Sequence, residues 1–208
     1  SSAGQQAYFF NRGGAAFVGK YLEIIDNNAS GSTFTADSSI DLGNNTGWTI
    51  NTLKQSQTIT FDTITDKTFG DPKFQIVANA SSTLPVSFSI VTGGSFISLV
   101  GDSITILGAG TVRLRATQAG DTVYNPAANV ERTFVIQKAN QTITFDTIHD
   151  KLITDPDFIL NTSATSGLPV TVSIVNSTAV TLNGDTVSIA DTGLVTLRAT
   201  QAGDLNYN

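Results

Sequence analysis

The stretch Gln57-Thr-Ile-Thr-Phe-Asp-Thr-Ile64 decides the fold of this chain, because the same letters return at residues 141–148. Further along, Arg115-Ala-Thr-Gln-Ala-Gly-Asp121 returns at residues 198–204. The two copies lie 84 residues apart at the front and 83 at the back. A unit of this size that occurs twice is a folded module used more than once. Copying a module extends a surface, whereas an active site needs no copy, so the repeat favours a spacer or a binding array over an enzyme.

The repeat divides the chain into three predicted parts. Residues 1–56 do not match it, and we interpret them as the C-terminal part of a preceding β-rich domain, either a solenoid or a sandwich. Residues 57–140 form the first repeat, and residues 141–208 form the second, which lacks its last strand. Because the chain has no Met and the second copy stops early, we expect both ends to be cuts through a much longer polypeptide.

The composition excludes several classes of function. Only 13% of the residues are charged and the net charge is −6, so the surface repels nucleic acid and anionic membranes. No run approaches the roughly 18 apolar residues that span a bilayer. Cysteine is absent, so no disulfide supports the fold and no thiol chemistry is available. The abundance of Thr and Val is typical of a secreted or cell-surface β protein, and we expect an extracellular location.

Seven short runs in the first repeat alternate apolar and polar residues with the period of a β-strand. We therefore predict an all-β fold of tandem seven-stranded, immunoglobulin-like Greek-key sandwiches. The runs are 57–61, 74–78, 86–90, 96–100, 103–107, 111–117 and 131–137. The inward positions expected to carry the structural role include Ile59, Phe61, Phe88, Ile104, Val112 and Leu114.

Shorter strand patterns precede the repeats, and a short linker separates them. Strands are predicted at residues 8–10, 16–25, 32–36 and 48–50, with Gly, Asn and Ser clusters between them. Lys138-Ala-Asn140 is the whole connection between the two repeats, which predicts a semi-rigid rod.

Several short motifs carry a family resemblance that covers residues 57–208. They are the opening Gln57–Phe61, Thr83-Leu-Pro-Val86 with its copy Gly167-Leu-Pro-Val170, Gly108-Ala-Gly-Thr-Val112, Ala116-Thr-Gln-Ala-Gly-Asp121 and Tyr124-Asn125. The repeat resembles the tandem bacterial immunoglobulin-like (Big/MBG-type) modules of large surface or secreted adhesin-like proteins. That resemblance implies an immunoglobulin-like fold and a role as stalk, adhesive tip or spacer.

The segment before the repeats carries a looser resemblance. Residues 29–36 and 43–50 are similar to the closing stretch of β-rich domains in large bacterial surface proteins. Some of those are adhesins exported by type IX secretion in gliding Gram-negative bacteria. The resemblance implies a filament or adhesin context.

Two kinds of candidate site emerge from the residue pattern. Carboxylates gather after the first strand of each repeat, where a calcium ion would stiffen the junction through oxygen ligands, although Asp also forms turns by itself. These calcium candidates are Asp62, Asp66, Asp71, Asp146, Asp150 and Asp155. Asp followed by Ser or Thr and an aliphatic residue resembles an O-glycosylation signal of Gram-negative surface proteins, and an Asp turn before a strand gives the same letters. The acceptors would be Thr63, Ser103, Thr122, Thr147 and Thr186.

No catalytic residue, and no cofactor other than calcium, is predicted. His149 is the only histidine and has no nucleophile beside it in the sequence, so no triad is defined. Tyr124 and Tyr207 occupy matching places and are expected to pack inside their own module as in a tyrosine corner.

The sequence therefore predicts a structural stalk or filament segment of a large extracellular bacterial surface protein that presents a distal functional domain. The alternatives are a glycan- or surface-binding module and an accessory spacer of a secreted enzyme. The expected partners are other modules of the same long chain or neighbouring subunits, and also an extracellular glycan or surface. Strand addition is expected at the unpaired edge beside residues 192–200.

Overall fold

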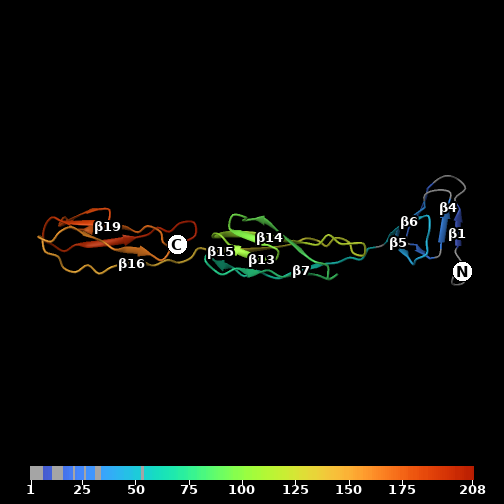
Figure 1. Ribbon diagram of the computed structural model, residues 1–208, viewed down its shortest axis with the longest axis horizontal. Helices are drawn as coiled ribbons and strands as arrows, with labels where there is room; N and C mark the ends of the chain where they lie inside the picture. The colour runs from blue at the N-terminus through green and yellow to red at the C-terminus, as the bar shows by residue number, and fades with distance from the viewer. Residues whose placement is uncertain (1–6, 11–15, 21, 26, 31–33, 53) are drawn as a thin grey trace. The chain divides into compact units, whose positions relative to one another are not determined.

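The structure is a computed structural model that describes residues 7–10, 16–20, 22–25, 27–30, 34–52 and 54–208 (Figure 1). Across these residues it contains β-strands and no helix. The chain is an all-β protein with several small sheets, as the alternating sequence predicts.

The chain divides into two compact units whose boundary lies inside the first repeat. The first unit is Ser1–Thr63, Ile76–Ser89 and Leu114–Arg132. The second is Ile64–Gln75, Ile90–Arg113 and Thr133–Asn208. This division differs from the repeat boundaries, so the predicted module limits at 57–140 and 141–208 stay a prediction. "First repeat" and "second repeat" below refer to those residue ranges.

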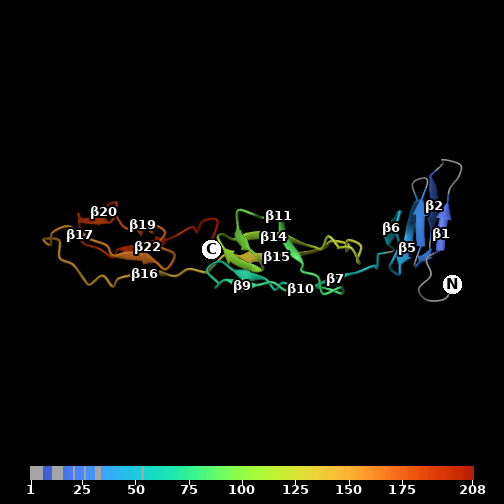
Figure 2. The same cartoon turned by 45° about the vertical axis from the view of Figure 1, so that its right-hand side comes forward.

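The described residues before the repeats form six strands, and the pairings found among them are parallel. They are β1 (Ala7–Phe10), β2 (Phe17–Lys20), β3 (Glu23–Ile24), β4 (Asn27–Ser30), β5 (Phe34–Asp41) and β6 (Trp48–Thr52) (Figure 2). Strand β1 pairs with β4, β5 pairs with β2, β3 and β6, and paired residues lie 13 to 20 positions apart. Parallel ladders at so short a spacing are typical of a β-solenoid, which favours the solenoid over the sandwich.

Stacked side chains fill the space between these strands. Phe34 and Ala36 on β5 are buried, and the Phe34 ring lies 5.4 Å from the ring of Trp48 on β6. The buried Ser39 hydroxyl accepts the backbone N–H of Leu22 and donates to the carbonyl of Asp37. The predicted strand 16–25 is divided into β2 and β3, and β4 was not predicted. Tyr21, Ser32 and Thr33 of the predicted strands lie outside the described residues.

The first repeat contains nine strands instead of the predicted seven. They are β7 (Ile59–Phe61), β8 (Lys67–Thr68), β9 (Phe74–Gln75), β10 (Ala78–Ala80), β11 (Ser87–Thr92), β12 (Ile97–Val100), β13 (Ser103–Ile106), β14 (Gly110–Thr117) and β15 (Val130–Gln137). The predicted strand 74–78 is broken because β9 pairs with β13 whereas β10 pairs with β7 in another sheet. Strand β8 was not predicted, since two residues carry no alternation.

Three sheets make up the first repeat. Strands β7 and β10 form one, β12, β13 and β9 form another, and the third has the order β11-β14-β15-β8. The predicted inward residues Ile59, Phe61, Ile104, Val112 and Leu114 are buried, which confirms the period-two pattern. Phe88 is half-buried and lies 5.4 Å from Phe61, ring to ring. The finer immunoglobulin-like Greek-key assignment stays a prediction.

The second repeat contains seven strands over its shorter length. They are β16 (Ile143–Phe145), β17 (Phe158–Ile159), β18 (Thr162–Ala164), β19 (Thr171–Asn176), β20 (Val180–Asn183), β21 (Thr186–Ile189) and β22 (Thr196–Thr200). They pair as β16–β18, β17–β21–β20 and β19–β22. Leu160, Val172, Val180 and Val187 form its core. Among the described residues of this repeat, neither β8 nor β15 has a counterpart.

Candidate functional site

A tight loop with the same sequence pattern occurs in both repeats. We call residues 118–125 and 201–208 the Tyr-Asn loops. In the first, the Asp121 carboxylate accepts the backbone N–H groups of Val123 and Tyr124 at 2.8 and 2.7 Å. Gly120 has a φ of +74°, and a Cβ there would stand 2.3 Å from the Tyr124 carbonyl oxygen, so the turn requires glycine.

Buried glutamines hold this loop in the first repeat. The Gln57 amide donates to the Gln118 side-chain oxygen at 2.5 Å and to the Asn125 carbonyl at 2.7 Å. The Ser82 hydroxyl donates to the Gln57 side-chain oxygen at 2.5 Å, and the Gly120 N–H donates to the Gln118 oxygen at 2.5 Å. Because Gln57, Ser82 and Gln118 are buried, each bond satisfies a group that would otherwise lack a partner.

The second repeat reproduces the network with the matching residues. Gln141 donates to the Gln201 side-chain oxygen, and to the Asn208 carbonyl at 2.5 Å. The Ser166 hydroxyl donates to the Gln141 oxygen, and the Gly203 N–H donates to Gln201. These glutamines are half-buried. No sequence pattern marks these glutamines and serines as functional, although the glutamines stand in the letter-for-letter repeats.

Each loop also pairs with the linker residue that precedes its own repeat. Isolated parallel bridges join Gln55 to Tyr124 and Ala139 to Tyr207. In the first, the Gln55 N–H donates to the Val123 carbonyl at 2.7 Å, and the Asn125 N–H donates to the Gln55 carbonyl at 2.8 Å. The second has the corresponding bonds at 2.8 and 3.0 Å. The linker backbone is therefore held by the module that it enters.

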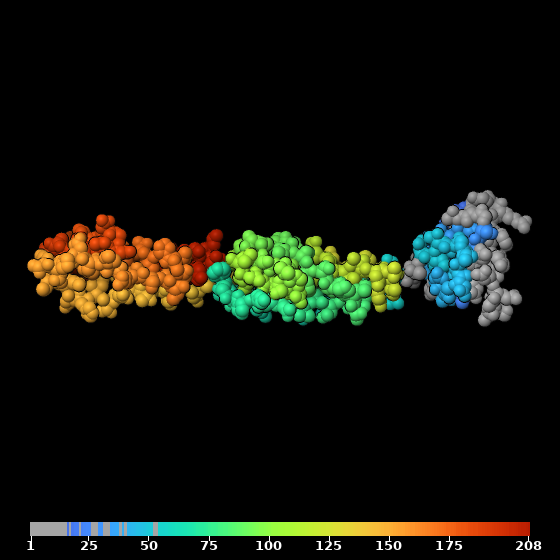
Figure 3. All heavy atoms as spheres, in the orientation of Figure 1, coloured from blue at the N-terminus to red at the C-terminus, as the bar shows by residue number. Residues whose placement is uncertain are grey.

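Within the second unit, the second Tyr-Asn loop also contacts residues of the first repeat. The Asn206 side-chain oxygen accepts the Ala109 N–H at 2.9 Å. The Tyr207 ring lies edge-on to Phe69, with centroids 5.5 Å apart and an interplanar angle of 83°. The red atoms of this loop lie against the first repeat in Figure 3. The tyrosine-corner prediction is therefore wrong for Tyr207, whose ring packs on the neighbouring repeat.

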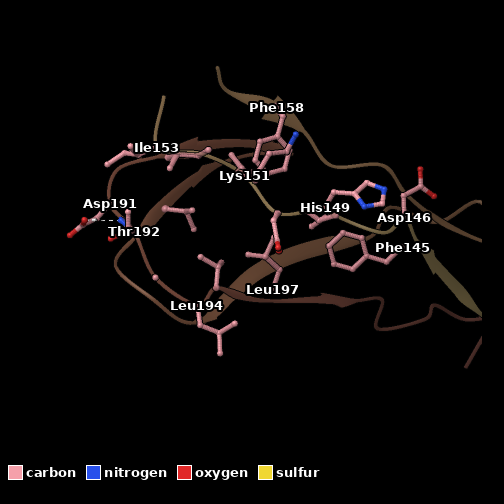
Figure 4. Close-up of a pocket in the computed structure, with 17 residues that line it drawn as sticks. Phe145, Asp146, His149, Lys151, Ile153, Phe158, Asp191, Thr192, Leu194 and Leu197 are labelled. Carbon is pink, nitrogen blue, oxygen red and sulfur yellow. Dashed lines mark hydrogen bonds between the residues drawn. The ribbon is translucent and has the colours of Figure 1, made fainter. Parts of the chain in front are cut away.

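A groove opens in the second repeat beside β22 (Figure 4). It has a volume of about 440 Å³ and is lined by Phe145, Phe158, Val187, Val195 and Leu197 among others. His149 lines this groove and is exposed to solvent.

The predicted calcium residues act as turn and strand supports. The Asp71 and Asp155 carboxylates accept the N–H groups of Thr68 and Leu152 three residues earlier, at 2.9 and 3.0 Å. The Asp66 carboxylate accepts the Val135 N–H at 2.8 Å.

The structure does not gather these carboxylates into one site. Asp62 and Asp146 hydrogen-bond through their own backbone N–H groups to Val77 and Asn161, and the Asp150 side chain is exposed. Across the described part of the chain, no three acidic or histidine side chains form a group able to hold a metal ion. Calcium binding stays a prediction without an assembled site.

The predicted glycosylation acceptors differ in exposure. Thr63, Thr122 and Thr147 are exposed. Ser103 and Thr186 are half-buried at the starts of β13 and β21. Glycosylation of these hydroxyl groups stays a prediction.

The comparisons with known proteins leave the family open. No protein-family model matches the chain. No curated protein matches it either. The crystal structure of Drosophila N-cadherin EC1-4 is similar over 76% of this chain and 49% of that one, with 9% identity and a TM-score of 0.28. This chain spans about half the length of that fragment, and a likeness at this score carries no argument about function.

None of the described residues forms a helix long and apolar enough to span a bilayer.

Proposed function

We propose that this chain is a structural stalk or filament segment of a large extracellular bacterial surface protein. Immunoglobulin-like modules would hold a distal functional domain away from the cell. The observation that supports this most is the paired linker, since Gln55 and Ala139 are each bound by the Tyr-Asn loop that follows them. A linker held by its backbone loses most of its freedom to swing, and a strut needs that stiffness.

The pairing of β8 with β15 adds support for a role under tension. Strand β8 lies near the start of the first repeat and β15 at its end, and they pair in parallel with Ile136 opposite Lys67. The Phe69 N–H donates to the Gln137 carbonyl at 2.9 Å. Tension that separates the two ends draws these strands past each other, so their hydrogen bonds carry the load together.

Replacing Asp66 with Ala should weaken this pairing. The carboxylate accepts the Val135 N–H, and its loss should lower the stability of the first repeat by about 1 kcal/mol. The mean force at which the first repeat unfolds should fall, as measured by single-molecule force spectroscopy on the whole chain. Asp150→Ala is the matched control, because the second repeat has no β15 for its carboxylate to bind.

Two outcomes would contradict the stalk assignment. Equal unfolding forces for the original chain and the Asp66→Ala variant would show that the pairing of β8 with β15 does not resist the applied force. Saturable binding of the isolated chain to a glycan on an array would instead support the alternative binding module.

A further inference from the structure

The groove of the second repeat is lined by counterparts of residues that form the closed core of the first. Phe145, Val187 and Leu197 match Phe61, Ile104 and Leu114 in the repeated sequence. Those three are at most 1% exposed in the first repeat, whereas Phe145 and Leu197 are half-buried. The first strand of each repeat shows the same difference in exposure. Ile59 is 8% exposed, whereas its counterpart Ile143 is 37% exposed.

The first repeat shows what occupies the corresponding place. Strand β15 lies between β14 and β8 in the sheet order, with Phe134 and Ile136 buried. The Phe134 ring packs edge-on against Phe74, at 5.9 Å between centroids. The counterpart of Phe74 is Phe158, which lines the groove. An aromatic side chain placed as Phe134 is placed would therefore meet Phe158.

The wall of the groove already has the geometry found in the complete repeat. Lys151 lies over the Phe158 ring at 4.9 Å, and Lys67 lies over Phe74 at 4.8 Å. The Asp155 carboxylate caps the Leu152 N–H as Asp71 caps that of Thr68. A preformed site loses little conformational entropy when it is filled.

We propose that this groove is a docking site for an added β-strand with the residue pattern of Val130–Gln137. The occupant is an extended peptide segment whose apolar side chains, two residues apart, fill the groove as Phe134 and Ile136 fill the first repeat. Addition of such a strand buries apolar surface and pairs the free edge of β22.

The first repeat also indicates the polar contacts that would fix the register. There, the Asp66 carboxylate accepts the Val135 N–H, and the Phe69 N–H donates to Gln137. The matching groups in the second repeat are the Asp150 carboxylate and the Ile153 N–H, both at the groove. The carboxylate of Asp150 should accept an N–H of the added strand.

The test uses the whole chain and a synthetic peptide of residues 126–140. We expect saturable one-to-one binding by calorimetry, with slower amide hydrogen exchange in β17 and β22 and no change in the first repeat. A peptide carrying Phe134→Asp and Ile136→Asp should bind at least tenfold more weakly. In the chain, Asp150→Ala should weaken binding severalfold, whereas Asp102→Ala, which removes an exposed carboxylate of the first repeat, should leave it unchanged.

A second form of the chain keeps the test independent of the peptide's solubility. Residues 126–140 joined after Asn208 should fill the groove, slow amide exchange in β22 at least tenfold and abolish peptide binding. The proposal would be overturned if neither the added peptide nor the joined segment slowed amide exchange in β22. Equal affinity of the chain for the original and the aspartate-substituted peptide would also overturn it. Self-association of the unmodified chain that protects β22 would also overturn it, because the occupant would then be a second copy of the folded chain.

Discussion

Replacing Phe134 with Ala is expected to lower the opening free energy of the first repeat by about 4 kcal/mol, the usual cost of removing a fully buried phenyl ring. The side chain is 1% exposed and packs edge-on against Phe74. The substitution leaves β15 without its main anchor and should bring the first repeat close to the open state of the second. Hydrogen exchange of β13 amides in the whole chain measures this loss directly.

The adjacent exposed residue supplies the control for this prediction. Thr133→Ala changes a side chain on the same strand that points to solvent, so its effect should stay within about 0.5 kcal/mol. A loss below about 1 kcal/mol for Phe134→Ala would show that the site collapses around the smaller residue. The core of the first repeat would then be a wrong guide to how the groove of the second repeat is filled.

Gly120→Ala should destabilise the first repeat by about 3 kcal/mol or more, because it combines backbone strain with a collision. The new Cβ would stand 2.3 Å from the Tyr124 carbonyl oxygen and 2.7 Å from the Asn125 carbonyl carbon, and both are backbone atoms. Opening the loop also separates the Gln57 amide from the Asn125 carbonyl. Faster amide exchange at Gln55 and Asn125 would report the loss of the linker pairing.

Gly101→Ala separates the two contributions to this effect. Gly101 also has a positive φ, of +61°, but a Cβ there meets nothing within 4 Å. Its substitution should therefore carry only the strain of about 1–2 kcal/mol. Similar losses for both substitutions would mean that the Tyr-Asn loop tolerates the extra atom, and that its closed geometry is not required.

The alternation of apolar residues predicted the strands of the first repeat well and their interruptions poorly. Period two places Ile59 and Phe61 in the core, because the alternation follows directly from strand geometry. It could not show that the run 74–78 leaves one sheet and joins another, since both parts keep the same alternation. Strand β8 exists because β15 pairs with it, and such a tertiary partner has no local signal.

The Tyr-Asn loops show a different limit of sequence reasoning. The repeated letters include Gln118 and Asp121, but polar residues in a turn are normally assigned to solvent. Burial of Gln57 and Gln118 became apparent only when their hydrogen-bond partners, 61 to 68 residues away, were in place. The calcium prediction for the Asp residues of each repeat met the same limit. Sequence spacing does not show which backbone N–H group a carboxylate accepts in the folded chain.

We expect the second Tyr-Asn loop to couple the two repeats into a stiff strut. The chain has no cysteine, so spin labels at Ser98→Cys and Thr181→Cys, both exposed, would be unique. Pulsed electron-spin resonance should give one narrow distance distribution, which Tyr207→Ala broadens and Tyr124→Ala, the matched change in the first loop, leaves unchanged. A broad distribution in the unsubstituted chain, unaltered by Tyr207→Ala, would contradict the claim.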